Sequence, residues 1–160
     1  MKLVDVLFKP RGRIEARQFW LGWGIIVAAN IVANFLSFLG IILYLGLIYV
    51  GVCVYGKRLH DMGRSAWLVA IPWGVGLVLG TIGLFLCAPA IMEATQYDPR
   101  ALEDPEAAMA VMGPYLALIG LGFVVWAAFT VWVGIGKSDP NENEHGGNPQ
   151  NPAASADVFV

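Results

Sequence analysis

Charged side chains are scarce in this sequence. Asp, Glu, Lys and Arg make up 14% of the 160 residues, whereas soluble domains average about 25%. The net charge is −2, and the sequence has no basic stripe and no nucleic-acid-binding motif, so we expect no DNA or RNA partner. Hydrophobic residues reach 58%, which is more apolar surface than so short a chain buries in a soluble fold. The composition is therefore typical of an integral membrane protein.

Long apolar runs predict four membrane-spanning helices. One crossing needs about 20 residues at a rise of about 1.5 Å per residue. The run from Phe19 to Tyr55 is too long for a single crossing, so we predict a tight hairpin between Ser37 and Gly40. In Asp104–Glu106, an N-cap residue, a proline and an acidic residue predict that the last helix begins before the lipid. The predicted spans are about 19–38, 39–56, 66–90 and 112–135, which together predict an all-α, four-helix membrane bundle.

The positions of the positive charges predict the orientation of the chain. Five Lys or Arg residues precede the first span, and three more lie between the second and third spans. The loop between the third and fourth spans carries a single basic residue, Arg100, among acidic ones. Lys and Arg near span ends concentrate on the cytoplasmic side. We therefore predict that both termini are cytoplasmic.

Two terminal segments flank the predicted membrane domain, which covers residues 19–136. In residues 1–18, Leu3, Leu7 and Phe8 recur at helical spacing beside charged residues, which predicts a short amphipathic helix on the membrane surface. Residues 137–160 are rich in Asn, Pro, Gly and Ser. We expect this tail to be disordered and cytoplasmic, because it cannot bury enough apolar surface to order itself.

Four residues inside the spans are predicted to pack helices together. Asn30 and Asn34 lie one turn apart in the first span, and amides in lipid need partners, so we expect this face to point at other helices. A pore or substrate lining is the alternative interpretation. Gly76 and Gly80 have GxxxG spacing, which lets helix backbones approach closely.

Cysteine and histidine are both rare. We expect Cys53 and Cys87 to lie near opposite sides of the membrane, whereas a disulfide needs Cα atoms within about 7 Å. No disulfide is therefore predicted. His60 and His145 have no further ligand at metal-binding spacing, so we expect neither a metal nor a cofactor.

The polar residues concentrate at the predicted cytoplasmic surface. The second and third spans are joined by KRLHDMGRSAW, and GRIEARQFW precedes the first span. Gly63 can supply a turn with positive φ, and Ser65 is placed to cap the third span. Arg13 and Arg17 are expected on one face of a helix. The predicted site residues are Arg13, Arg17, Arg58, His60, Asp61, Gly63, Arg64 and Ser65.

RLHDMGRSAW resembles the RLHDxGRSGW signature of the domain of unknown function 805 family, which consists of small bacterial inner-membrane proteins. Gly12-Arg13 and Phe19-Trp20 match the GR…FW motif of that family. The resemblance covers roughly residues 8–149 and implies a multi-pass protein of the bacterial cytoplasmic (inner) membrane, with no implied activity. The chain departs from the pattern at Ala66, where the family often has Gly, and at Ala16, where it usually has Arg.

Four roles are open for the polar residues. In the structural role, which we favour, the arginines pair with Asp61 and Glu15 and fix the helix ends, and each basic residue near an anionic leaflet adds about 1 kcal/mol. In a binding role, the start of the third span and Arg64 hold a phosphate or an anionic lipid head group. A catalytic role makes His60 and Asp61 an acid–base pair acting on lipid head groups, but adjacent residues rarely face each other.

The fourth role is a channel or transporter for small solutes or ions, formed by several copies of the chain. The predicted spans contain no Asp, Glu, Lys, Arg or His, and such residues normally mark transport pathways. We therefore expect a non-catalytic structural, scaffold or regulatory protein. Its expected partners are membrane lipids and either another membrane protein or further copies of itself.

Overall fold

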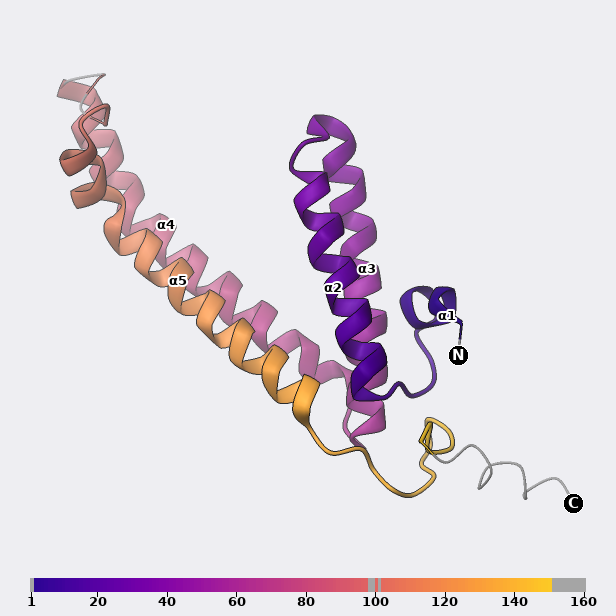
Figure 1. The fold of residues 1–160 in the computed structure, drawn as a ribbon. Coiled ribbons are helices and arrows are strands. Elements are labelled where there is room, and N and C mark those ends of the chain that lie inside the picture. Colours follow the sequence, from indigo (N-terminus) through magenta and orange to yellow (C-terminus); the bar gives the residue numbers. More distant parts are fainter. Residues whose placement is uncertain (1, 98–99, 101, 151–160) are drawn as a thin grey trace, which may run out of the picture. The chain divides into compact units, whose positions relative to one another are not determined.

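The computed structural model describes residues 2–97, 100 and 102–150 (Figure 1), and every regular element within them is helical. Contacts divide the chain into two units, Met1–Val69 with Val131–Val160 and Ala70–Thr130, and each unit is described by itself. The elements are α1 (Leu3–Phe8), α2 (Ala16–Ala33), α3 (Ser37–Asp61), the 3₁₀ helix η1 (Ala66–Val69), α4 (Ala70–Tyr97) and α5 (Pro105–Ile135).

Four helices are long and apolar enough to cross a membrane, namely Ala16–Ala33, Ser37–Asp61, Ala66–Tyr97 and Pro105–Ile135. In the most apolar window of each, 11–22% of the residues are buried inside the protein. The remaining apolar surface needs a cover other than water, which a lipid bilayer supplies. The all-helical class and the presence of four helices able to span a membrane are thus confirmed for the described residues, while the single bundle and the cytoplasmic termini stay predictions.

The turn between α2 and α3 lies earlier than the sequence indicated. Residues 34–36 form it, and Ser37, with a φ of 46°, already begins α3. Gly40 is therefore a helical residue and not part of the turn. It is buried directly against the backbone carbonyl of Ala33, where a β-carbon would overlap that oxygen. Gly40 thus lets the two helices approach closely at their connection.

Helix α3 also extends further than predicted, to Asp61 instead of residue 56. The connection to η1 is therefore only four residues long. Gly63 has a φ of 66°, which is the left-handed conformation that the sequence predicted for this turn. The backbone N–H of Trp67 donates to Oγ of Ser65 at 3.3 Å, so Ser65 caps the start of η1 as expected.

The short helix α1, which the sequence predicted, packs against the α2–α3 hairpin. Val6 is buried and lies near Gly22, whose lack of a side chain also accommodates Val54. Lys57 on α3 is completely buried, and its Nζ donates to the carbonyl oxygens of Asp5 at 2.5 Å and of Val6 at 2.6 Å. A lysine that bonds the last carbonyls of a helix satisfies groups that otherwise lack partners.

The asparagines expected to bind other helices find partners in their own. Nδ2 of Asn30 donates to the carbonyl of Ile26 at 2.9 Å, and Nδ2 of Asn34 donates to the carbonyl of Asn30 at 2.8 Å. Asn34 is exposed and follows the last residue of α2. Each amide thus donates to the carbonyl one turn back. Its oxygen and second N–H can still bind another helix, so the packing role of these residues stays a prediction.

Helix α5 begins at Pro105, within the segment that the sequence indicated and outside the predicted span. Oδ2 of Asp104 accepts a hydrogen bond from the N–H of Ala107 at 3.1 Å, and Glu106 lies in the first turn. A side-chain oxygen at the N-cap, such as that of Asp104, satisfies one of the N–H groups that lack a partner at the start of a helix. The N-cap, the proline and the acidic residue thus have the roles predicted for them.

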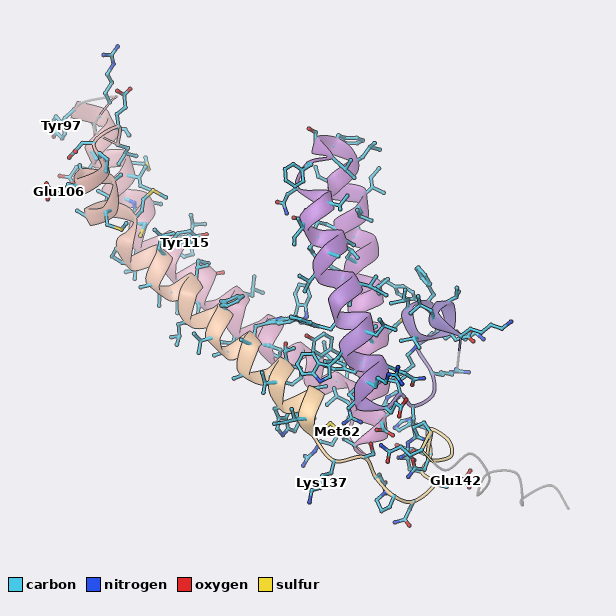
Figure 2. The ribbon with its side chains drawn as sticks, in the orientation of Figure 1. Met62, Tyr97, Glu106, Tyr115, Lys137 and Glu142 are labelled. Atoms are coloured by element: carbon cyan, nitrogen blue, oxygen red, sulfur yellow. The ribbon has the colours of Figure 1, made fainter. Side chains whose placement is uncertain are left out.

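Glycines bring α4 and α5 together. A β-carbon added to Gly122 would lie 3.7 Å from Cα of Gly76, and one added to Gly80 would lie 3.9 Å from Cδ1 of Ile119. The closest approach is at Gly83, where a β-carbon would lie 2.7 Å from Cδ2 of Tyr115, which Figure 2 labels on α5. The small residues therefore allow close packing within this hairpin.

We expect Gly83→Ala to destabilise the protein, because the new methyl group must displace the ring of Tyr115. Overpacking of this kind costs about 1–3 kcal/mol. The matched control is Gly74→Ala on the same helix, since a β-carbon there has no atom within 4 Å. Thermal unfolding in detergent should show a lower midpoint for Gly83→Ala alone. Equal midpoints for the two variants would contradict the observed packing of α4 on α5.

Candidate functional site

A completely buried carboxylate, that of Asp61 at the end of α3, lies at the centre of the polar residues. Nε of Arg13 donates to its Oδ1 at 3.2 Å, and Nη1 of Arg58 forms an ion pair with its Oδ2. The hydroxyl of Ser138 also donates to Oδ2, at 2.5 Å. We call Arg13, Arg58, Asp61 and Ser138 the Asp61 cluster.

Arg58 joins α3 to the end of α5. Its side chain is 1% exposed, and Nε donates to the carbonyl of Val133 at 3.2 Å while Nη2 donates to the carbonyl of Gly136. The last carbonyls of a helix lack partners within the helix and carry partial negative charge. Arg58 therefore satisfies the C-terminal end of α5 and binds Asp61 at the same time.

Arg13 binds the tail that follows α5. Its guanidinium donates to three tail carbonyls, those of Asp139 at 2.5 Å, Asn141 at 2.7 Å and Gly146 at 3.2 Å. The N–H of Asp139 in turn donates to the backbone carbonyl of Asp61 at 2.7 Å. Arg13 is 3% exposed, so the tail covers its charge almost entirely.

The tail is therefore ordered where the sequence predicted disorder. Residues 137–150 fold back on the end of α3, and Nδ2 of Asn143 donates to the carbonyl of His60 at 3.1 Å. A backbone bridge between Asn143 and Gly146 closes the loop. The prediction rested on the lack of apolar surface, but polar groups bonded to a buried arginine order this segment instead. Residues 151–160 of the predicted disordered tail lie outside the described residues.

Arg17 does not belong to the Asp61 cluster, which corrects the expectation of a shared helical face. Arg13 lies in the irregular segment before α2, whereas Arg17 lies in the first turn of α2 and is exposed. Glu15 does not form an ion pair with the arginines among the described residues. Its side chain instead forms a capping box with Gln18 at the start of α2, which satisfies N–H groups there.

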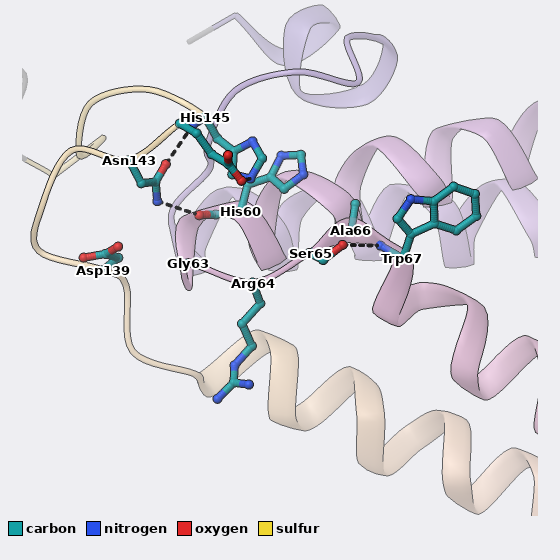
Figure 3. Close-up of a pocket in the computed structure, with 10 residues that line it drawn as sticks. His60, Gly63, Arg64, Ser65, Ala66, Trp67, Asp139, Asn143 and His145 are labelled. Atoms are coloured by element: carbon teal, nitrogen blue, oxygen red, sulfur yellow. Dashed lines mark hydrogen bonds and ion pairs between the residues drawn. The ribbon is translucent and has the colours of Figure 1, made fainter.

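The two histidines stack on each other. The rings of His60 and His145 lie 3.6 Å apart at 11°, and Nδ1 of His60 lies 3.3 Å from the carbonyl oxygen of Gly12. Figure 3 shows the Arg64 side chain pointing away from this pair, and its guanidinium lies 5.4 Å from the ring of Trp132. The histidines help to line an open pocket of about 640 Å³, whose lining residues are His60, Gly63, Arg64, Ser65, Ala66, Trp67, Asp139, Asn143, Glu144 and His145.

This geometry separates His60 from Asp61. The ring of His60 is directed to Gly12 and His145, whereas the carboxylate of Asp61 is enclosed by arginine and serine donors. A general base must reach the proton that it removes, and Asp61 is completely buried. The two side chains are therefore not arranged as an acid–base pair.

The sequence did not reveal the roles of three residues that bind other segments in this part of the structure, namely Lys57, Ser138 and His145. The sequence places Lys57 in the predicted loop after the second span, and Ser138 and His145 in the predicted disordered tail. The only sequence signal for the tail was the Asn- and Gly-containing NENEHGGNP, which can form tight turns. Within the described residues no three His, Cys, Asp or Glu side chains are grouped as metal ligands, and Cys53 and Cys87 are free thiols.

The fold and the buried cluster define a multi-pass membrane protein whose polar groups gather at one end of a membrane-spanning helix. Residues 7–99, more than half of the chain, match the family described as "Protein of unknown function (DUF805)". The chain belongs to this family, as its RLHDMGRSAW motif indicated. No curated protein and no solved structure matches this chain.

Replacing Asp61 should destabilise the protein strongly, because Asp61→Asn leaves two buried arginines without a countercharge. Removing one partner of a buried ion pair costs about 3–5 kcal/mol. The control is Asp5→Asn, which breaks the Asp5–Lys9 pair of 2.7 Å, in which the lysine is exposed and the aspartate partly exposed. The hydrogen bond from Lys9 lowers the pKa of Asp5. Solvent nevertheless screens such an ion pair, so we expect little change in the unfolding midpoint of Asp5→Asn.

Thermal and denaturant unfolding in detergent measure this difference. Asp61→Ala should behave like Asp61→Asn, since both remove the charge. An unfolding midpoint for the Asp61 variants as high as that of Asp5→Asn would show that the cluster does not stabilise the fold.

Proposed function

We propose that this protein is a non-catalytic component of the bacterial cytoplasmic membrane, with a structural, scaffolding or regulatory role. The observation that supports this proposal is that groups of the protein itself bind the guanidinium groups of Arg13 and Arg58. Their guanidinium groups bind one carboxylate, one hydroxyl and five backbone carbonyls other than that of Asp61. Arginines that served a substrate would need donors free to bind it.

The cluster joins segments that are far apart in the sequence. Residue 13, residues 58–61 and residues 136–146 meet around one carboxylate. No buried side-chain nitrogen or oxygen within the described residues lacks a hydrogen-bond partner. Polar networks whose members are all satisfied make a structure rigid. The cluster thus favours a role in which the protein presents a fixed surface to other molecules.

We further propose that this surface faces the cytoplasm. The basic residues before α2 and near the end of α3 favour this orientation, as does their near absence between α4 and α5. Anionic lipid at the Asp61 cluster itself is not supported, since both of its arginines are buried. Arg64 and Arg17 are exposed and are better placed to meet lipid.

The catalytic alternative has less support than the structural one. His60 and Asp61 are directed to different partners, and Asp61 is inaccessible. A channel or transporter formed by several copies would need a polar pathway, and Asn30 and Asn34 already bond within their own helix. A membrane protein or further copies of the chain fit the proposed scaffold role better, and no nucleic acid or cofactor is required.

A reconstitution experiment tests the non-catalytic role. Protein in vesicles of phosphatidylethanolamine, phosphatidylglycerol and cardiolipin should leave the phosphorus NMR spectrum of the head groups unchanged over hours. Vesicles without protein are the control. Conversion of a head group that His60→Ala abolishes would contradict the proposal and favour the enzyme. A solute or ion flux that exceeds that of empty vesicles would contradict it in favour of the transporter.

A further inference from the structure

A second concave site lies between α1 and the start of α2, away from the Asp61 cluster. It is a groove of about 560 Å³, which is within the range of about 300–1,000 Å³ typical of ligand sites. Because α2 is one of the four spans and begins at Ala16, the groove lies at the level where this helix would enter the bilayer. The lining residues are Leu3, Val6, Glu15, Arg17, Gln18 and Leu21.

The walls of this groove are fixed by specific contacts. Nζ of Lys57 binds the carbonyls of Asp5 and Val6, and the hydroxyl of Tyr49 donates to the carbonyl of Phe8 at 3.0 Å. These two side chains attach α1 to α3 from the C-terminal end of α1. The groove is therefore built into the fold, since a six-residue helix would not keep its place without such contacts.

The polar rim of the groove carries one charge of each sign. Arg17 is exposed, and within the described residues no carboxylate pairs with it. The carboxylate of Glu15 accepts the capping hydrogen bond of α2, which leaves it further acceptor capacity. The apolar side chains of Leu3, Val6 and Leu21 complete the lining.

We propose that this groove binds one phospholipid whose head group contains both a phosphate and a primary ammonium, as phosphatidylethanolamine does. Arg17 binds the phosphate, since guanidinium groups donate well to phosphate oxygens. Glu15 accepts a hydrogen bond from the ammonium, and an acyl chain lies along Leu3, Val6 and Leu21. This site does not depend on the proposed structural role, because it shares no residue with the Asp61 cluster.

The charge pattern distinguishes this lipid from others. Phosphatidylglycerol has the phosphate but no cation for Glu15. Phosphatidylcholine has a cation, but its quaternary ammonium has no N–H to donate. A site that used Arg17 alone would instead favour phosphatidylglycerol, because basic residues attract anionic lipid. The proposal therefore predicts that the groove prefers phosphatidylethanolamine to both phosphatidylglycerol and phosphatidylcholine.

Native mass spectrometry of the full chain from mild detergent, with each of the three lipids added at equal concentration, tests the site. The wild type should retain one phosphatidylethanolamine in preference to the other two. Arg17→Gln should lower this retention about fivefold, the effect of losing one basic contact at a lipid surface. Arg11→Gln is the matched control, since Arg11 is exposed but does not line the groove.

A second variant tests the role of the carboxylate. Glu15→Gln keeps an oxygen for the capping hydrogen bond, so the fold should persist, as its thermal midpoint will verify. It should lose the preference for phosphatidylethanolamine and retain phosphatidylglycerol more strongly, because Arg17 is then the one charged group of the groove. Equal retention of all three lipids by the wild type would overturn the proposal. So would an Arg17→Gln variant that retains as much lipid as Arg11→Gln. Neither result would bear on the head-group conversion assay.

Discussion

The ion pairs of one buried carboxylate, that of Asp61, join the segment before α2 and the segment after α5 to the end of α3. Arg13 and Arg58 are both nearly inaccessible to solvent, and an unpaired charge in such a place is strongly unfavourable. Asp61 pairs with both guanidinium groups, and backbone carbonyls accept hydrogen bonds from their remaining N–H donors. The positions of these arginines therefore depend on Asp61, and the path of the tail depends on Arg13.

The last turn of α3 binds both α1 and the described segment that follows α5. Lys57 binds the final carbonyls of α1, while Arg58 and Asp61 bind the end of α5 and the tail. All three side chains are buried at the end of a helix that is otherwise exposed and apolar along much of its length. The spans thus supply the surface that lipid covers, and this turn supplies the contacts that give the terminal segments a defined structure.

Features that depend on local chemistry were predictable from the sequence. The four apolar helices, the turn at Gly63 and the N-cap at Asp104 follow from hydrophobic runs and backbone preferences. Features that depend on distant contacts were not predictable. The tail has too few apolar residues to order itself, and it is ordered by carbonyls that Arg13 binds, which no side-chain pattern reveals. The same holds for Lys57, whose partners are also backbone carbonyls.

Amide hydrogen exchange of the tail, with the protein in lipid nanodiscs, tests the central claim most directly. The N–H groups of Asp139 and Gly146 are hydrogen-bonded, so they should exchange slowly in the wild type. In Arg13→Met they should exchange at the rate of an unstructured peptide, because the tail loses its anchor. Exchange at that rate already in the wild type would contradict the claim that a buried ion-pair cluster orders residues 137–150.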